Sequence, residues 1–380
     1  MKVLYLTEDY IGSMVHHNLC QAIATTSTNI DLTLFLFERP NYGLRDLRSM
    51  FNNLKYKVVT SVFCGNMLLF KTFFPYKVRV KSRALAQSID ISEFDFVVAS
   101  TLFSDGAVAL RLWKRYKIPY IVVVRGTDVN LYLKYMPYLN GLGRAIVANA
   151  QKVVFVAPRQ YNEFCQSSAF RKVLPMVQQK TAIITNGIDN EWLTNTCFDD
   201  NNRNTNSVLY IGAFDANKNV QTLIAACKEA RKQNAQLQLN LVGGGGACHN
   251  EIIQQVAENS DWITFHGAIY DKAKLRQICR ANAVFAMVSV SETFGLVYFE
   301  ALSQGLPVIY TKNQGFDGFF TNLNVGYAVA HNSVGEIAEK INLALQNRLC
   351  FVADIKKINF GDFCWQQKAY EWIKTIKHND

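Results

Sequence analysis

The sequence predicts an α/β protein made of two doubly wound domains, and three observations lead to this fold class. The chain has 380 residues, 49% of them hydrophobic, which is enough material for two buried cores. Short apolar runs alternate with helical patterns along the chain, as expected for βαβ units with parallel sheets. A segment rich in polar turn formers, NTCFDDNNRNTN at 195–206, separates two series of such units.

The first series predicts an N-terminal domain over 1–200. Apolar runs bounded by polar residues are typical of buried parallel strands. They occur at VLYLT (3–7), LTLFLF (32–37), FDFVVAS (94–100), YIVVVRG (120–126) and KVVFVAP (152–158). Helical stretches such as SMVHHNLCQAIATT and AVALRLWKRY lie between these runs and predict the crossover helices.

The second series predicts a C-terminal domain over 206–361. Its expected strands are SVLYIGA (207–213), LQLNLVGGGG (237–246), WITFHG (262–267), AVFAMVS (283–289) and LPVIYTK (306–312). The closing helix, 362–380, is expected to join the N-terminal domain. We therefore expect two domains that face each other across a cleft, with ligands at the carboxyl ends of the strands.

Charge and cysteine usage restrict the partners and the compartment. The net charge of +10 favours anionic partners: nucleic acid, phosphorylated small molecules or acidic lipid headgroups. Nine cysteines are scattered singly, without a metal-binding spacing, which is typical of a reduced cytoplasmic compartment. The N-terminus MKVLYLTEDY reads as a first strand rather than a signal peptide, and no apolar run is long enough to span a membrane. We expect a cytoplasmic protein that is free in solution or peripheral on the inner face of the cell membrane.

One stretch, SVSETFGLVYFEALSQGLPVI at 289–309, carries the strongest chemical signal. A strand ends, SETFG turns, and a helix follows, which places Glu292 in the loop at the mouth of the cleft. The N–H groups that open this helix suit a phosphate, and Glu300 further along suits sugar hydroxyls. That layout matches a nucleotide diphosphate sugar. The alternative is a plain amphipathic helix with a capping Ser and Glu.

The same stretch resembles the signature of retaining glycosyltransferases of family 4, in which two acids flank seven residues. Other segments resemble that family in order and spacing: ITNGID (184–189), YIGAFDANKNVQTLIAA (210–226), LNLVGGGG (239–246), ITFHGAI (263–269) and GDFCWQQKAYEWIKTI (361–376). The resemblance implies the GT-B fold of two Rossmann-like domains. It also implies a UDP- or GDP-sugar donor, and neither a cofactor nor a bound metal.

The resemblance assigns roles to individual residues. Glu292 lies beside the donor sugar, Glu300 binds the ribose hydroxyls, and Lys218 neutralises the phosphates as the leaving group departs. Glu292, Lys218 and Arg125 form the expected catalytic set, and His16 and Asp128 the expected acceptor contacts. The expected donor site consists of Gly12, Gly212, Lys218, Gly243, Gly267, Ala268, Glu292, Thr293, Phe294, Gly295, Leu296 and Glu300.

This chain departs from the family pattern at two positions, and two of the assigned residues also have a purely structural interpretation. The family has a basic residue where this chain has Ala213, and it has His where this chain has Arg125. We therefore expect Arg125 to replace part of the missing charge; the alternative is that it pairs with Asp128. Lys218 could instead be a solvated loop lysine, and His16 a histidine on the surface of a helix.

A basic stretch lies between residues 47 and 89, where no Asp or Glu occurs. Its cations are Arg48, Lys55, Lys57, Lys71, Lys77, Arg79, Lys81 and Arg83. They are interleaved with aromatic and aliphatic residues, which suits an anionic membrane surface. Nucleic acid is disfavoured because no recognition motif accompanies the charge. The alternative is a solvated face over a buried core.

These observations together predict a retaining glycosyltransferase. It would move a sugar from a nucleotide-diphosphate sugar to a glycan or lipid-linked acceptor in the biosynthesis of capsule, lipopolysaccharide or exopolysaccharide. The alternatives are a GT-B sugar-nucleotide epimerase and a catalytically degenerate GT-B partner subunit. Sequence leaves open the donor base, the sugar, the acceptor and the linkage.

Overall fold

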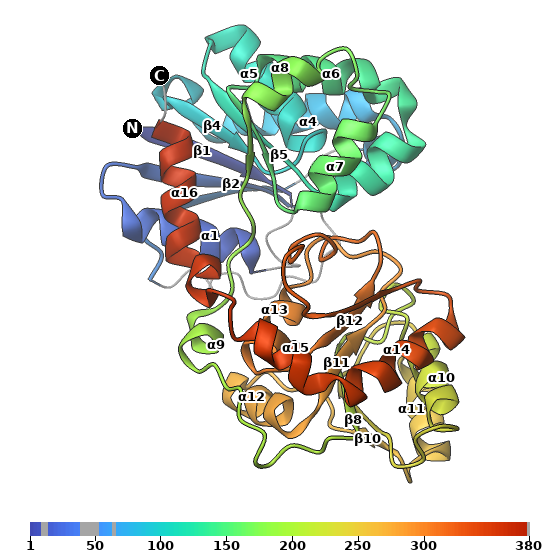
Figure 1. The fold of residues 1–380 in the computed structure, drawn as a ribbon. Helices are drawn as coiled ribbons and strands as arrows, with labels where there is room; N and C mark the ends of the chain where they lie inside the picture. Colours follow the sequence, from blue (N-terminus) through green and yellow to red (C-terminus); the bar gives the residue numbers. More distant parts are fainter. Residues whose placement is uncertain (9–13, 39–52, 63–65, 378–380) are drawn as a thin grey trace. The chain divides into compact units, whose positions relative to one another are not determined.

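The computed structural model describes residues 1–8, 14–38, 53–62 and 66–377, and the chain divides into two compact units. Unit 1 is Met1–Gly187 with Trp365–Asp380, and unit 2 is Ile188–Cys364. Each unit has a parallel sheet covered by helices and a hydrophobic core of its own (Figure 1). This confirms the predicted fold class.

Unit 1 contains a seven-stranded sheet among its described residues, in the order β3-β2-β1-β4-β5-β6-β7. The strands are β1 (Lys2–Thr7), β2 (Asp31–Glu38), β3 (Lys57–Val62), β4 (Phe96–Ala99), β5 (Tyr120–Val124), β6 (Lys152–Phe155) and β7 (Thr181–Ile183). The central strands are apolar because both faces of a parallel sheet are covered: every residue of β5, YIVVV, is buried.

Helices connect the strands of unit 1 and cover its sheet. They are α1 (Val15–Thr26), α3 (Met67–Thr72), α4 (Phe74–Ser88), α5 (Ser104–Tyr116), α6 (Asn140–Asn149), α7 (Pro158–Gln166) and α8 (Leu174–Gln179), with short turns η1 (Ile91–Glu93), η2 (Asp128–Leu133) and η3 (Pro137–Leu139). The last helix, α16 (Trp365–Lys377), packs along α1, as the red and blue helices of Figure 1 show. None of the helices described is long and apolar enough to cross a membrane.

Unit 2 contains a six-stranded sheet in the order β10-β9-β8-β11-β12-β13. The strands are β8 (Ser207–Gly212), β9 (Gln238–Gly243), β10 (Ile263–Phe265), β11 (Val284–Met287), β12 (Val308–Thr311) and β13 (Gly326–Val329). The helices are α9 (Asn190–Thr194), α10 (Val220–Ala230), α11 (His249–Glu258), α12 (Lys272–Ala281), α13 (Leu296–Ser303), α14 (Val334–Gln346) and α15 (Arg348–Ile355), followed by the turn η4 (Phe360–Phe363).

The chain passes between the units earlier than the polar segment at 195–206 suggested. It enters unit 2 at Ile188 and leaves after Cys364. The polar segment belongs to unit 2 because the buried guanidinium of Arg203 donates hydrogen bonds to the backbone carbonyls of Asn282 and Gln304. The turn-forming residues at 195–206 therefore belong to a loop that is held onto unit 2, and the passage from unit 1 to unit 2 lies before them.

Each sheet reverses its strand order at one point, and that point fixes where a ligand site is expected. In unit 1 the reversal lies between β1 and β4, and in unit 2 between β8 and β11. Right-handed crossovers send the helices on the two sides of the reversal to opposite faces, so the loops part at the carboxyl ends of these strands. Loops that follow β1 and β4, and β8 and β11, are therefore the places to look for chemistry.

Candidate active site

Lys218 and Glu292 meet at the strand-order reversal of unit 2. The Nζ atom of Lys218 lies 2.8 Å from Oε2 of Glu292, although the two residues come from the loops after β8 and β11. Both side chains are partly exposed, by 26% and 13%. The structure thus brings together two predicted site residues, and the alternative of a solvated loop lysine is wrong for Lys218.

The loop that carries Lys218 is tied to β11. The backbone N–H of Lys218 donates to Oδ1 of Asp215 at 2.8 Å, which closes a tight turn. Asn219 follows with a left-handed backbone (φ 57°), a conformation that asparagine tolerates better than most residues. Its amide group donates to the carbonyls of Val288 and His331 at 3.0 and 2.7 Å. These contacts fix the base from which Lys218 reaches Glu292.

The loop that carries Glu292 is held on both sides. The backbone N–H of Ser291 donates to Oδ1 of Asn217 at 3.0 Å, which links it to the Lys218 loop. The backbone N–H of Glu292 donates to Oε1 of Gln314 at 3.0 Å, and its carbonyl accepts from the N–H of Gly315 at 2.8 Å. The position of Glu292 is therefore set by two segments that are distant from it in the sequence, one at Asn217 and one at Gln314 and Gly315.

The N-terminus of α13 opens beside this ion pair. Gly295 has φ 80° and a Cβ there would lie 2.4 Å from the Tyr298 ring, so only glycine fits at this turn. The backbone N–H of Thr293 donates to Oε1 of Glu292. The backbone N–H groups of Phe294, Gly295 and Leu296 donate to no atom in the part of the chain that the structure describes. Helix-start N–H groups of this kind carry partial positive charge and suit an anion.

Three predicted glycines line up at the carboxyl edge of the sheet beside this helix. Gly212 pairs with Gly243 in adjacent strands, and a Cβ on Gly243 would lie 1.8 Å from the carbonyl oxygen of Gly212. The backbone N–H of Gly243 donates to the carbonyl of Gly267 at 2.9 Å, and the exposed Ala268 follows. The edge therefore has almost no side chains, which leaves its backbone accessible to a ligand.

Glu300 lies one and a half turns into α13 and is only half-buried. Its carboxylate makes no hydrogen bond to the described residues, whereas the adjacent Asp189 and Lys272 pair with each other. The pKa of Glu300 is raised to about 7, because burial and the nearby Asp189 carboxylate raise it more than Lys272 lowers it. A half-buried carboxylate without a protein donor is suited to accept hydrogen bonds from ligand hydroxyls.

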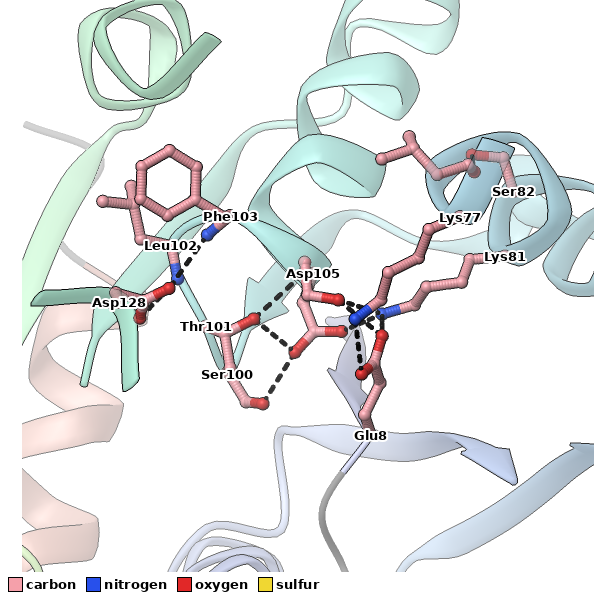
Figure 2. A network of polar contacts seen from close by, with 12 residues as sticks. Glu8, Lys77, Lys81, Ser82, Ser100, Thr101, Leu102, Phe103, Asp105 and Asp128 are labelled. Carbon is pink, nitrogen blue, oxygen red and sulfur yellow. Dashed lines mark hydrogen bonds and ion pairs between the residues drawn. The ribbon is translucent and has the colours of Figure 1, made fainter. Parts of the chain in front are cut away.

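In unit 1 a buried ionic network occupies the equivalent reversal between β1 and β4 (Figure 2). Lys81 extends from α4 and its Nζ lies 2.6 Å from both Glu8, which follows β1, and Asp105 on α5. Lys77 lies 3.0 Å from the other oxygen of Glu8. Burial alone would raise the pKa of Glu8, but Lys81 and Lys77 hold it well below its usual value. Sequence reasoning missed this network.

The network corrects part of the prediction for the basic stretch. Lys77 and Lys81 are 7% and 1% exposed, so neither faces a membrane or solvent. Lys55, Lys57, Arg79 and Arg83 are exposed, as a surface role requires. Arg48 lies outside the described residues, as does the side chain of Lys71, and so does Gly12, the donor-site glycine predicted in the loop after β1.

The Asp128 side chain is buried and binds backbone groups of unit 1 instead of facing solvent. It is fully buried, and its carboxylate accepts hydrogen bonds from the backbone N–H groups of Leu102, Phe103 and Arg125 at 3.0–3.1 Å. The pKa of Asp128 is raised to about 6, because burial raises it more than the three N–H groups lower it. With no exposed surface, Asp128 is placed to hold this loop together and not to meet an acceptor.

Arg125 and His16 lie near each other at the carboxyl ends of β5 and β1. Nε of Arg125 donates to the carbonyl of Ser100 at 2.8 Å rather than pairing with the carboxylate of Asp128. His16 is 4% exposed, with Nδ1 2.8 Å from the Tyr5 hydroxyl, so the alternative of a helix-surface histidine is wrong. Burial lowers the pKa of His16 well below its usual value, and Arg125 lowers it further, so the ring is neutral.

The chain resembles known proteins in sequence over 70% of its length and in fold over 99% of it. Residues 198–358 match the family model described as glycosyl transferases group 1. Over 274 residues the chain is 24% identical to the GtfA subunit of a UDP-N-acetylglucosamine–peptide N-acetylglucosaminyltransferase from Streptococcus pneumoniae. That alignment covers 70% of this chain and 52% of the relative, so the chain matches about half of the relative's length.

Two solved structures share the whole fold. The Anabaena protein HepE, in complex with UDP, and the lipopolysaccharide outer core galactosyltransferase WaaB each have a TM-score of 0.71. Each is 16% identical, and each comparison covers 99% of both chains. At this identity the likeness establishes the two-unit fold alone.

Proposed function

We propose, from the premise that this chain is a glycosyltransferase of the GT-B type, that it moves a sugar, with retention at the anomeric carbon, from a nucleotide-diphosphate sugar to a glycan or lipid-linked acceptor. The process it serves is surface polysaccharide biosynthesis. HepE binds UDP, and WaaB is a lipopolysaccharide galactosyltransferase, which supports a uridine donor and a surface-glycan product. A UDP-sugar is therefore the first donor to test, with a GDP-sugar second.

The contact between Lys218 and Glu292 beside the open start of α13 carries this proposal. A cation, three helix-start N–H groups and two carboxylates lie around one strand-order reversal. In the proposed complex the diphosphate takes the N–H groups and Lys218. Glu292 then accepts hydrogen bonds from the sugar hydroxyls, and Glu300 from the ribose hydroxyls. The glycine edge lets the nucleoside approach the backbone closely.

The protein's work in the reaction is charge stabilisation and positioning. Negative charge grows on the diphosphate as the glycosidic bond breaks, and Lys218 and the α13 N–H groups stabilise that charge where it develops. Glu292 fixes the orientation of the sugar. The departing phosphate takes the proton of the attacking hydroxyl, which enters from the same face. Neither a metal ion nor a cofactor is required in this scheme.

The direct test is a donor panel followed by product analysis. UDP-, GDP- and ADP-sugars are screened by thermal shift, since a ligand at 100 times its Kd stabilises by about 2.7 kcal/mol. The donor that binds is incubated with acceptors, and nuclear magnetic resonance reads the anomeric configuration of the product. Transfer with retention supports the proposal. Release of an epimerised nucleotide sugar would favour an epimerase, and the absence of donor binding would favour a degenerate partner subunit.

Donor affinity is expected to rise with pH through the titration of Glu300. The pKa of this group, about 7, lies above the usual glutamate value of 4.5. Its ionised form accepts the ribose hydroxyls, so donor binding requires loss of a proton wherever the group is still protonated. Affinity should therefore increase about tenfold between pH 6 and 8. The same shift lowers the stability of the ligand-free protein as pH rises from about 4.5 through 7, since the folded state then binds more protons than the unfolded state.

Calorimetry of the best donor across this pH range checks the expectation. A nucleotide sugar is used because its diphosphate does not titrate there. The Glu300→Gln variant, which cannot ionise, should bind more weakly at pH 8 and show a flat profile. A wild-type profile that is flat, or a variant that keeps the slope, would assign the ribose contact elsewhere.

Arg125→Ala is expected to weaken both donor affinity and turnover if this guanidinium replaces the charge missing at Ala213. A charge-assisted contact is worth about 1.5–3 kcal/mol, which corresponds to a loss of about 10- to 150-fold in kcat/KM. Arg144→Ala is the matched control, because Arg144 also donates to a backbone carbonyl, that of Ala169 at 2.9 Å. Unchanged donor affinity and turnover in Arg125→Ala would refute the compensation.

A further inference from the structure

Exposed apolar side chains lie on the segments that form a small cavity in unit 1, and two of them, Leu131 and Tyr138, line it. They come from α3, from the residue that follows it, and from the segment 131–138. They are Leu68, Leu69, Phe73, Leu131, Tyr135 and Tyr138, each exposed by 43–70%, and we call this set the α3 patch. Clustered exposed groups of this size mark an interaction surface, whereas single ones need no explanation.

The cavity that adjoins the α3 patch is lined mainly by apolar atoms. Its volume is about 160 Å³, and its walls include Met67, Phe70, Phe74, Tyr132 and Met136. This is close to the ~150 Å³ of an apolar cavity that accepts benzene, and well below the ~300 Å³ at which ordinary ligand pockets begin. It suits a short piece of hydrocarbon chain and is too small for a sugar nucleotide.

The backbone around the cavity departs from regular helix. The turn η2 is a π-helix, a rare form that occurs mostly at functional sites. It is anchored at its first residue, Asp128, whose carboxylate holds the loops after β4 and β5. The wide turn brings Leu131 and Tyr132 to the cavity wall.

The two segments that supply the α3 patch carry charge of one sign. No Asp or Glu occurs in 53–89 or in 129–162, the two segments that supply the patch and its surroundings. Lys134 is exposed between the patch residues and lies over the Tyr135 ring at 5.1 Å. Arg79 and Arg83 are exposed on α4. Lys77 lines the cavity, but its ammonium is neutralised by Glu8.

We propose that the α3 patch docks on an anionic phospholipid bilayer, with the end of one acyl chain entering the cavity. Apolar side chains with a basic surround and no carboxylate are complementary to acidic headgroups over hydrocarbon. A second copy of this chain is the weaker occupant, because two acid-free basic surfaces repel each other. The proposed docking surface differs from the basic stretch at 47–89 in two ways. It includes the segment 131–138, and it excludes the ammonium groups of Lys77 and Lys81, which are buried in ion pairs.

The inference rests on the proposed function in one respect: membrane docking would bring unit 1 to a lipid-linked acceptor. Vesicle flotation without donor tests it separately. The full chain should bind phosphatidylcholine vesicles that contain phosphatidylglycerol, bind vesicles of phosphatidylcholine alone at least about fivefold more weakly, and lose binding in high salt. Leu68→Ser with Phe73→Ser should reduce binding at least about tenfold, and Lys134→Glu should reduce it on anionic vesicles.

Tyr270→Ser is the matched control, since Tyr270 is an 88% exposed aromatic in unit 2. It should float like the wild type. Circular dichroism and the release of nucleotide from donor in solution should be unchanged in the Leu68/Phe73 variant. The proposal is overturned if the wild type does not float, or if Tyr270→Ser loses binding equally. It is also overturned if sedimentation shows that Leu68→Ser with Phe73→Ser dissociates a dimer without affecting flotation.

A second measurement addresses the cavity. Tyr138→Trp places a fluorophore at its wall, and Tyr270→Trp places one in unit 2 as the control. Phospholipids brominated on the acyl chain should quench the first variant beyond the wild-type level and leave the second at that level. Equal quenching of both variants, or none beyond wild type, would refute entry of the chain.

Discussion

Replacing Lys81 with methionine is expected to destabilise unit 1 by about 3–5 kcal/mol, the typical cost of removing one partner from a buried ion pair. The ammonium of Lys81 contacts Glu8 and Asp105 at 2.6 Å and is 1% exposed, so no water replaces it. Methionine replaces the apolar stem of the lysine side chain but not its ammonium, so two buried carboxylates are left with less compensation. Lys77 still pairs with Glu8, whereas Asp105 keeps, among the described residues, the hydroxyls of Ser100 and Thr101.

The loss is expected to depend on pH in a defined direction. The folded-state pKa of Glu8 lies well below the usual glutamate value of 4.5, so its pairing stabilises the protein above that pH and the contribution disappears as pH falls. The difference between the wild type and Lys81→Met should therefore be largest at neutral pH and shrink in acid. Hydrogen exchange of β1 and α4 measures it within unit 1, because a chain of two units need not unfold in one step.

Arg83→Met is the matched control for this experiment. Arg83 is exposed on the same helix, and substitutions at such positions usually change stability by less than 0.5 kcal/mol. If Lys81→Met and Arg83→Met have equal effects, or if the deficit of Lys81→Met grows in acid, the buried network does not stabilise unit 1.

The fold could be predicted because periodicity is a local signal. The apolar runs of β1, β2, β5 and β6 in unit 1, and of β8, β9, β11 and β12 in unit 2, stand out from the helical patterns between them. The edge strands β3, β7 and β13 were missed. They are short or only partly buried, and half-buried edge strands do not form continuous apolar runs.

The sequence could single out Lys218 and Glu292 because each lies in a recognisable segment, at 210–226 and 289–309, although the segments are far apart in the chain. The residues that support the site could not be predicted, because they come from segments whose proximity depends on strand order. These residues, which bind the Glu292 loop and the end of β11, are Asn217, Asn219, Gln314 and Gly315. The ionic network of unit 1 did have a local signal. Lys77, Lys81 and Leu85 recur every four residues on α4, and Leu85 is fully buried, so a basic stripe shared its face with the core.

Lys218→Met and Glu292→Gln are both expected to reduce kcat/KM by about 10²–10³, yet to have opposite effects on UDP affinity. Lys218 is proposed to hold the diphosphate, so its loss should weaken UDP binding about tenfold or more. Glu292 is proposed to hold the sugar, and in the ligand-free protein its carboxylate competes with phosphate for the same ammonium at 2.8 Å. Glu292→Gln releases that ammonium, so UDP should bind as tightly as in the wild type or more tightly.

Calorimetry with UDP and steady-state kinetics with the donor separate these effects from a loss of folding. Both side chains are partly exposed, so each variant should change the free energy of unfolding by less than about 1 kcal/mol. Lys228→Met, at an exposed lysine of α10, is the control for removing a positive charge from unit 2. The double variant should lose little more turnover than either single one, because the two residues act on one bond. Equal loss of UDP affinity in both single variants would place Glu292 on the phosphates and overturn the division of roles at this site.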